Sequence, residues 1–189
     1  MSDRASPPPV TPTPTAAPSP PPPDLPHAGD ERTLLLAFLD VYRFEFIDRM
    51  RGLDGDALRQ RLTPGRLTLG ALVGHMALVE HIWFRVRMAG LDMPEPYASF
   101  DFDADPDAEM AWGESLAAIE LTAAFTAAVA ESDRLIADAA LDDLAATVPA
   151  GVEPWNLRWI VIHMIEEYAR HTGHADLIRE SIDGELARP

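Results

Sequence analysis

The sequence predicts an all-α fold, a four-helix bundle, for a chain of 189 residues. Alanine and leucine dominate a composition that is 47% hydrophobic, and this mixture favours helices. Apolar residues recur at three- and four-residue spacing in four segments, and glycines and prolines separate those segments. No segment shows a convincing strand pattern. Long amphipathic helices bury their apolar faces against one another, so a bundle is the expected architecture.

The first part of the chain differs in composition from the rest. Eleven of the eighteen prolines lie in residues 1–28, which we predict to be a disordered, proline-rich tail; residues 29–189 are the predicted folded domain. A segment this rich in proline cannot build a core and samples polyproline II conformations. Docking of the tail onto an SH3-like partner is the alternative, and composition favours the simple disordered extension.

Capping residues and glycine or proline breaks bound the four helices. Asp30 and Thr68 are suitable N-caps for the first two helices, and Asp183-Gly184 is a typical stop signal after the last one. Residues 91–111 are acidic and hold three prolines, so they are predicted to be a long loop. The predicted helices span about 30–51, 68–90, 114–139 and 156–182.

Composition and charge exclude several classes of function. The formal net charge of −16 argues against nucleic-acid binding and against anionic membrane surfaces, both of which need basic patches. The chain has no cysteine, so any metal must be held by histidine and carboxylate ligands. No apolar run approaches the roughly 20 residues of a transmembrane helix, and no signal peptide is recognisable. We therefore expect a cytoplasmic protein without a membrane partner.

The most informative pattern lies in the last helix. His163, Glu167, His171 and His174 are spaced by four, four and three residues. At 3.6 residues per turn these side chains share an arc of about 80° on one helix face. Polar groups on a face that should bury leucines need hydrogen-bond partners or a metal ion.

The second predicted helix offers one more ligand, His75. Two ligands from the last helix and one from the second would form a three-ligand site with an open position, as in catalytic zinc sites. Gly74 beside it would allow a close backbone approach. The spacing leaves alternatives open: His75 could be a hydrogen-bonded core histidine, and His174 could replace Glu167 as a ligand or act as a general base.

Other conspicuous side chains have simpler explanations. His81 lies about 120° around the helix from His75, so it is expected to pack elsewhere or to face solvent. His163 is one turn from Glu167 and could orient that carboxylate. The tryptophans are expected in the core or in a pocket wall, and three arginines are expected in ion pairs with the many acids; these residues are Trp83, Trp155, Trp159, Arg158, Arg170 and Arg179.

Two segments carry a resemblance to a known family. Residues 72–84 resemble the histidine-bearing helix of the DinB-like metalloprotein superfamily. Its second signature, His-x-x-x-His followed by Arg-Gly-Gln, corresponds here to Glu167-Tyr-Ala-Arg-His171-Thr-Gly-His174. The glutamate resembles the branch of mycothiol-dependent maleylpyruvate isomerases, whose zinc is held by two histidines and one glutamate. The resemblance spans residues 32–184 and implies His75, Glu167 and His171 as metal ligands in an up-down-down-up bundle.

The resemblance also implies a function. We expect a divalent-metal-dependent enzyme, with zinc as the metal, that activates a low-molecular-weight thiol, mycothiol, for attack on an electrophile in a transferase or isomerase reaction. His174 is the candidate acid/base or thiol-orienting group, and His163 the candidate support of the ligands. The expected partners are the small-molecule thiol, the electrophile and a second copy of the chain in a homodimer.

Two other classes of function stay open. The first is a non-catalytic, metal-binding stress or small-molecule-binding protein of the same superfamily, in which His163 or His174 would close the coordination sphere. The second is a helical interaction module whose histidines form only a hydrogen-bonded polar core.

Overall fold

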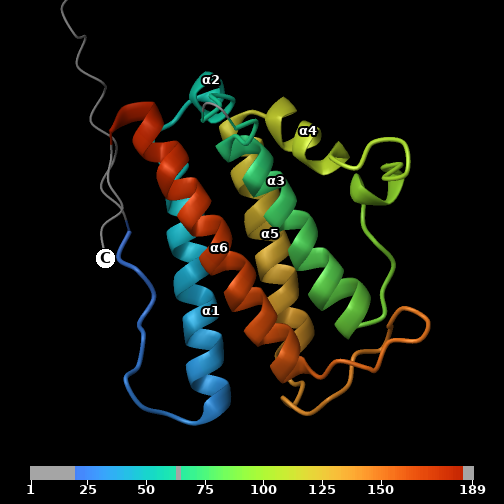
Figure 1. Cartoon of the computed structure of the whole chain (residues 1–189). Coiled ribbons are helices and arrows are strands. Elements are labelled where there is room, and N and C mark those ends of the chain that lie inside the picture. Colours follow the sequence, from blue (N-terminus) through green and yellow to red (C-terminus); the bar gives the residue numbers. More distant parts are fainter. Residues whose placement is uncertain (1–19, 63–64, 185–189) are drawn as a thin grey trace, which may run out of the picture.

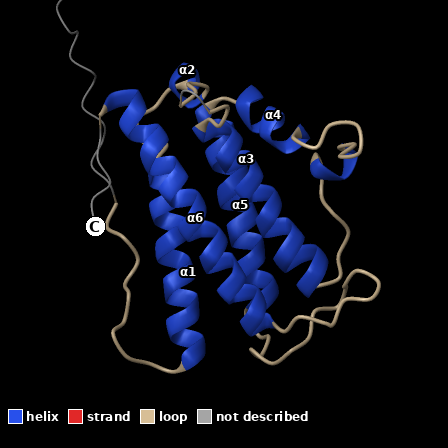
Figure 2. Cartoon of the chain, viewed as in Figure 1, coloured by secondary structure: helices blue, strands red, loops and turns tan. Residues whose placement is uncertain are grey.

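Four long helices lie side by side in the computed structural model, which describes residues 20–62 and 65–184 (Figure 1). No strand occurs among these residues, so the predicted all-α bundle is confirmed (Figure 2). One of the long helices, α3, continues without a break into η1, a segment of wider π-helical turns. The long elements are α1 (Glu31–Asp48), α3 (Leu69–Glu80) with η1 (His81–Met88), α5 (Ala118–Ile136) and α6 (Leu157–Asp183), and the short ones are α2 (Gly55–Leu58), η2 (Tyr97–Ser99) and α4 (Ala108–Ser115).

The predicted caps act as expected. The Asp30 carboxylate accepts a hydrogen bond from the Thr33 amide at 3.0 Å, at the start of α1. The Thr68 hydroxyl accepts one from the Ala71 amide at 3.0 Å, at the start of α3. Gly184 ends α6 with a φ of 76°, in the left-handed region that favours glycine. Local sequence therefore determines these helix ends.

Contacts between helix ends give the directions of the helices. Arg158 at the start of α6 donates to Glu31 at the start of α1 (2.8 Å), and Arg179 near the end of α6 donates to the backbone at the end of α1. Arg32, in contrast, donates to the Ala139 carbonyl beyond the end of α5 at 2.6 Å. Helices α1 and α6 therefore run parallel, and α5 runs antiparallel to them, as α3 does in Figure 1. These directions agree with the predicted up-down-down-up connectivity.

The predicted boundaries between the second and third long helices are wrong. A loop was expected over 91–111 and a single helix from about 114, whereas α4 begins at Ala108 and the chain breaks at Leu116 and Ala117. The break has a local cause, because both residues are extended and the Glu120 side chain accepts the Ala117 amide proton at 3.0 Å. The position of α4 has a tertiary cause: it packs on α3 through glycines, as described below.

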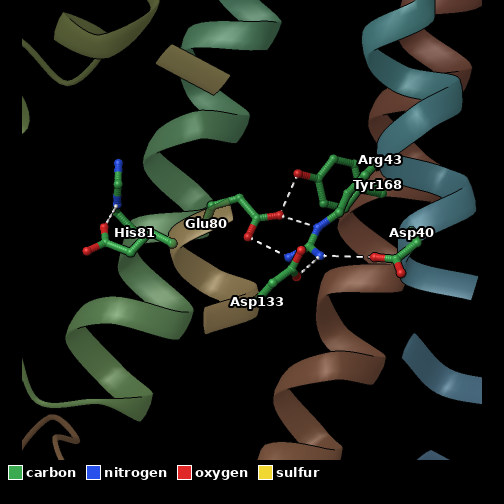
Figure 3. A network of polar contacts seen from close by, with 7 residues as sticks. Asp40, Arg43, Glu80, His81, Asp133 and Tyr168 are labelled. Atoms are coloured by element: carbon green, nitrogen blue, oxygen red, sulfur yellow. Dashed lines mark hydrogen bonds and ion pairs between the residues drawn. The ribbon is translucent and has the colours of Figure 1, made fainter. Parts of the chain in front are cut away.

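A buried polar network joins the helices in the core (Figure 3). The Arg43 guanidinium of α1 donates two hydrogen bonds of 2.8 Å to the Glu80 carboxylate of α3. Tyr168 of α6 donates to the same carboxylate at 2.6 Å, and Asp133 of α5 accepts from Arg43 at 2.8 Å. Glu80 and Tyr168 are fully buried. Because Tyr168 is anchored here, the rotation of α6, and with it the direction of the neighbouring Glu167, is fixed.

Two further expectations concern the chain as a whole. None of the helices in the described part of the chain is long and apolar enough to cross a membrane. The predicted disordered tail falls mostly on residues 1–19, which lie outside the described residues, and so it stays a prediction.

Candidate metal centre

Two partly buried histidines from different helices meet between α3 and α6. His75 on α3 and His171 on α6 have ring centroids 5.2 Å apart with an angle of 65° between their planes. Two imidazoles that bind one zinc ion at about 2.1 Å have centroids up to roughly 6 Å apart. The separation therefore suits a shared ion.

The Glu167 carboxylate lies beside this pair. Its Oε2 is 3.3 Å from Nε2 of His171, one turn further along α6. Its Oε1 is 3.6 Å from Nε2 of His163, one turn earlier, and 3.6 Å from Nη1 of Arg170. The structure thus brings four of the predicted site residues into one cluster between α3 and α6: His75, His163, Glu167 and His171.

His171 is held in the uncharged state that a metal ligand requires. Burial and the neighbouring His75 together lower its pKa to about 4, against the opposing effect of Glu167. Its Nδ1 atom is buried and has no hydrogen-bond partner among the described residues. Two donor atoms that share one tetrahedral zinc ion lie roughly 3.3 Å apart, so the 3.3 Å between Nε2 of His171 and Oε2 of Glu167 suits two ligands of one ion. The donor set therefore fits a divalent metal.

One residue of the cluster, Glu109 of α4, was missed by sequence reasoning. Its Oε1 lies 3.0 Å from Nδ1 of His75, and its side chain is almost completely buried. A carboxylate at Nδ1 fixes the histidine tautomer and leaves Nε2 available as a ligand, an arrangement common at metal sites. Glu109 lies at the end of the stretch that was expected to be a loop, and for this reason it was not considered.

The packing of α4 on α3 brings Glu109 to His75. Gly74 and Gly113 face each other so closely that a Cβ atom on Gly74 would lie 2.7 Å from the Glu109 carbonyl oxygen, and one on Gly113 would lie 2.4 Å from the Gly70 carbonyl oxygen. The close approach predicted at Gly74 is therefore confirmed. The matching Gly-x-x-x-Gly spacing of Gly70 and Gly74, with Gly113 four residues after Glu109, is the signal that could have revealed this contact.

The remaining predicted residues lie at the edge of the cluster or outside it. His174 is exposed, and its ring centroid is 5.5 Å from that of His171, so it lies at the rim. His81, the first residue of η1, extends on the side away from the Arg43 and Tyr168 contacts of Glu80 (Figure 3). There it packs on Tyr97, with ring centroids 5.5 Å apart, as its angular position had indicated.

A second group of ligand atoms overlaps the predicted set. Among residues 20–62 and 65–184, the group whose ligand atoms all lie within 4.8 Å of one another consists of His163, Glu166 and Glu167. All three belong to one surface turn of α6, Glu166 is exposed, and Arg170 already pairs with both carboxylates. The predicted set shares Glu167 with this group but takes its two histidines from α3 and α6, and the buried Glu109 supports one of them.

These features define the class of the protein: an all-helical bundle with a histidine and carboxylate cluster between its second and last long helices. Comparison with known families gives the assignment within this class. The chain belongs to the mycothiol-S-transferase family, whose model matches residues 34–184. A search of curated proteins found no match to the chain.

Proposed function

We propose that this chain is a metal-dependent mycothiol S-transferase in which His75, Glu167 and His171 hold the metal. The observation that carries the proposal is the meeting of the His75 and His171 rings, 5.2 Å apart, beside the Glu167 carboxylate. The family match supports the thiol substrate. Zinc is the metal that this set of two histidines and one carboxylate suits best, because catalytic zinc sites use three protein ligands and keep one position open.

The residues around the cluster have separate roles in this proposal. A divalent metal bound there would lower the pKa of a thiol in the open position and so favour its attack on an electrophile. Glu109 orients His75, and His163 orients Glu167. His174, exposed at the rim, exchanges protons with the thiol or with the leaving group.

The test combines metal content with conjugation activity. The protein and its His75→Ala and His171→Ala variants are analysed by elemental analysis and assayed with mycothiol and 1-chloro-2,4-dinitrobenzene. We expect one equivalent of metal in the parent protein and a loss of activity of more than roughly a hundredfold in both variants. The control is His81→Ala, which removes a histidine of η1 that packs outside the cluster. Zinc-saturated parent protein that neither binds mycothiol nor conjugates it would overturn the proposal.

A non-catalytic metal-binding role is the second candidate, and the position of His163 favours it. This histidine lies 3.6 Å from Glu167 and could fill the fourth coordination position. Cobalt-substituted protein distinguishes the two roles. A thiolate-to-cobalt charge-transfer band that appears with mycothiol supports the open, catalytic site, and an unchanged spectrum supports the closed one.

A further inference from the structure

A row of aromatic rings leads from the molecular surface to the candidate metal centre. Trp155 and Trp159 are stacked, with centroids 5.6 Å apart and planes 26° apart. Trp159 is stacked in turn on His163 at 5.1 Å and 20°. His163 then reaches Glu167 at 3.6 Å. The row is thus a continuous wall between the centre and the start of α6.

At its outer end this wall borders an open hollow of about 420 Å³. Side chains that are apolar yet exposed surround it; Trp159 is 43% exposed and Leu144 is 61% exposed. Exposed aromatic and apolar side chains gathered around a concavity mark ligand sites more often than plain surface. The hollow is lined by Leu144, Val152, Glu153, Pro154, Trp155, Asn156 and Trp159.

The hollow is part of the folded structure. Its outer rim belongs to the connection between α5 and α6, which lies at the end of the bundle where η1 stops and α6 begins (Figure 1). This connection is fixed to η1 by a hydrogen bond from the Ala146 amide to the Met88 carbonyl at 3.2 Å, and to the start of α6 by one from the Ala145 amide to the Trp155 carbonyl at 2.8 Å. Largely pre-formed sites of this size are typical for small molecules.

We infer that this hollow binds the sugar part of mycothiol, an inference that rests on the proposed function. Mycothiol carries its thiol on an acetylated cysteine and ends in two polyhydroxylated rings, glucosamine and inositol. The C–H faces of such rings pack on indole rings. Their hydroxyl groups can donate to the Glu153 carboxylate, and they can accept from the Asn156 amide, whose oxygen caps α6 by accepting from Trp159 N at 2.9 Å.

Distance and charge both agree with this occupant. Trp159 and Glu167 are eight residues apart on one helix, which corresponds to about 12 Å along its axis. Mycothiol bound through its sulfur at the metal centre, with its cysteine amide directed along Trp159, would therefore place its rings at the hollow. The rings are uncharged, because the glucosamine nitrogen is part of an amide. A neutral polyol suits a chain with a net charge of −16 better than an anionic ligand does.

The kinetic test compares two thiols that share the same reactive end. N-Acetylcysteine has the acylated cysteine of mycothiol but no rings. We expect Trp159→Ala to raise KM for mycothiol about five- to tenfold more than KM for N-acetylcysteine, the value of one aromatic stacking contact, because any effect through His163 acts on both thiols. Trp159→Phe should restore most of the affinity. Ile162→Ala is the matched control, since Ile162 is an apolar side chain of α6, 51% exposed, that does not line the hollow. Equal effects of Trp159→Ala on both thiols would overturn the inference.

A binding test separates this inference from the proposed function. N-Acetylglucosaminyl-inositol, which lacks the thiol but keeps the uncharged amide, is titrated against metal-free protein, and tryptophan fluorescence is recorded. Saturable quenching that Trp159→Ala weakens supports the sugar subsite, even if no transferase activity is found and the proposed function fails. Absence of saturable quenching overturns the subsite and leaves the metal site and the conjugation reaction unaffected.

Discussion

At the scale of single residues, the surroundings of the two histidines between α3 and α6 determine what the candidate centre can do. His75 has a buried carboxylate at its Nδ1, and His171 has a buried Nδ1 without a partner. The first arrangement makes the imidazole a better ligand, and the burial of the second, together with the neighbouring His75, lowers the pKa of His171 and keeps it neutral near pH 7. Both effects depend on the exclusion of water, which strengthens each electrostatic interaction.

The contact between Glu109 and His75 gives a prediction for metal affinity. Glu109→Gln keeps a hydrogen-bond acceptor near His75 but removes the negative charge. We expect zinc affinity to fall about ten- to hundredfold, with helix content unchanged, in a competition titration against a chelator. Asp103→Asn, which removes one charge from the exposed loop before α4, is the control. Equal zinc affinity in parent and Glu109→Gln protein would show that Glu109 does not support the ligand.

The lowered pKa of His171 gives a prediction for pH dependence. In metal-free protein this pKa is about 4, whereas in the unfolded chain it is near 6.5. Between these values the unfolded state binds a proton that the folded state does not, so stability falls as the pH decreases from 6.5 to 4 and this contribution then levels off. The loss is at most about 3.4 kcal/mol, and solvent screening at this partly exposed side chain makes it smaller.

Urea unfolding at several pH values tests this contribution. His171→Asn removes the titration, so the difference in unfolding free energy between the variant and the parent should change over the same pH interval. A difference that is constant with pH would contradict the assignment.

At the scale of elements, the contact between α3 and α4 is the feature on which the cluster depends. Gly74 and Gly113 let the two backbones touch, and this contact holds Glu109 against His75. The prediction of a loop over 91–111 missed the contact between α3 and α4. The sequence signal for that contact is the four-residue spacing of Gly70 and Gly74 and of Glu109 and Gly113, and not a helical period of apolar residues. Helix α4 is too short for periodicity to reveal it.

These glycines give a prediction with an internal control. Gly113→Ala would put a Cβ atom 2.4 Å from the Gly70 carbonyl oxygen, so α4 must shift, at a cost of about 1–3 kcal/mol. Gly173→Ala in α6 has no atom within 4 Å of the new Cβ and should gain up to about 1 kcal/mol from helix propensity. Thermal unfolding of both variants checks the opposite signs. Stabilisation by Gly113→Ala would contradict the packing described here.

At the scale of the whole molecule, the Arg43, Glu80 and Tyr168 network connects α1, α3 and α6 through one buried carboxylate (Figure 3). Burial raises the pKa of Tyr168, and the Glu80 charge raises it further. The tyrosine therefore stays a hydrogen-bond donor. The network selects one rotation of α6, and that rotation directs Glu167 and His171 toward α3.

Removal of one partner from this network should be costly. Arg43→Met leaves the Glu80 carboxylate buried without its counter-charge, and we expect a loss of about 3–5 kcal/mol in the free energy of unfolding. Tyr168→Phe removes one hydrogen bond to the same carboxylate and should cost about 1.5–3 kcal/mol. Urea denaturation gives both values. The double variant Arg43→Met with Glu80→Leu should lose less than Arg43→Met alone; a larger loss would show that the Glu80 carboxylate stabilises the core even without Arg43.

The sequence by itself determined the features that depend on short separations along the chain. The all-α class, the caps at Asp30 and Thr68 and the stop at Gly184 were predictable, because helix periodicity and capping are local. The common face of His163, Glu167 and His171 was predictable for the same reason. The direction of the four long helices came from the family resemblance.

Tertiary structure alone decided the contacts between residues far apart in the sequence. The pairing of Glu109 with His75 and the meeting of Arg43 with Glu80 and Tyr168 join side chains from different segments. A single sequence does not show which helix faces pack against each other, since many packings bury the same apolar residues. The packing that forms is selected by close glycine contacts and by the need of each buried charge for a partner, and both conditions are met only when the whole bundle is assembled.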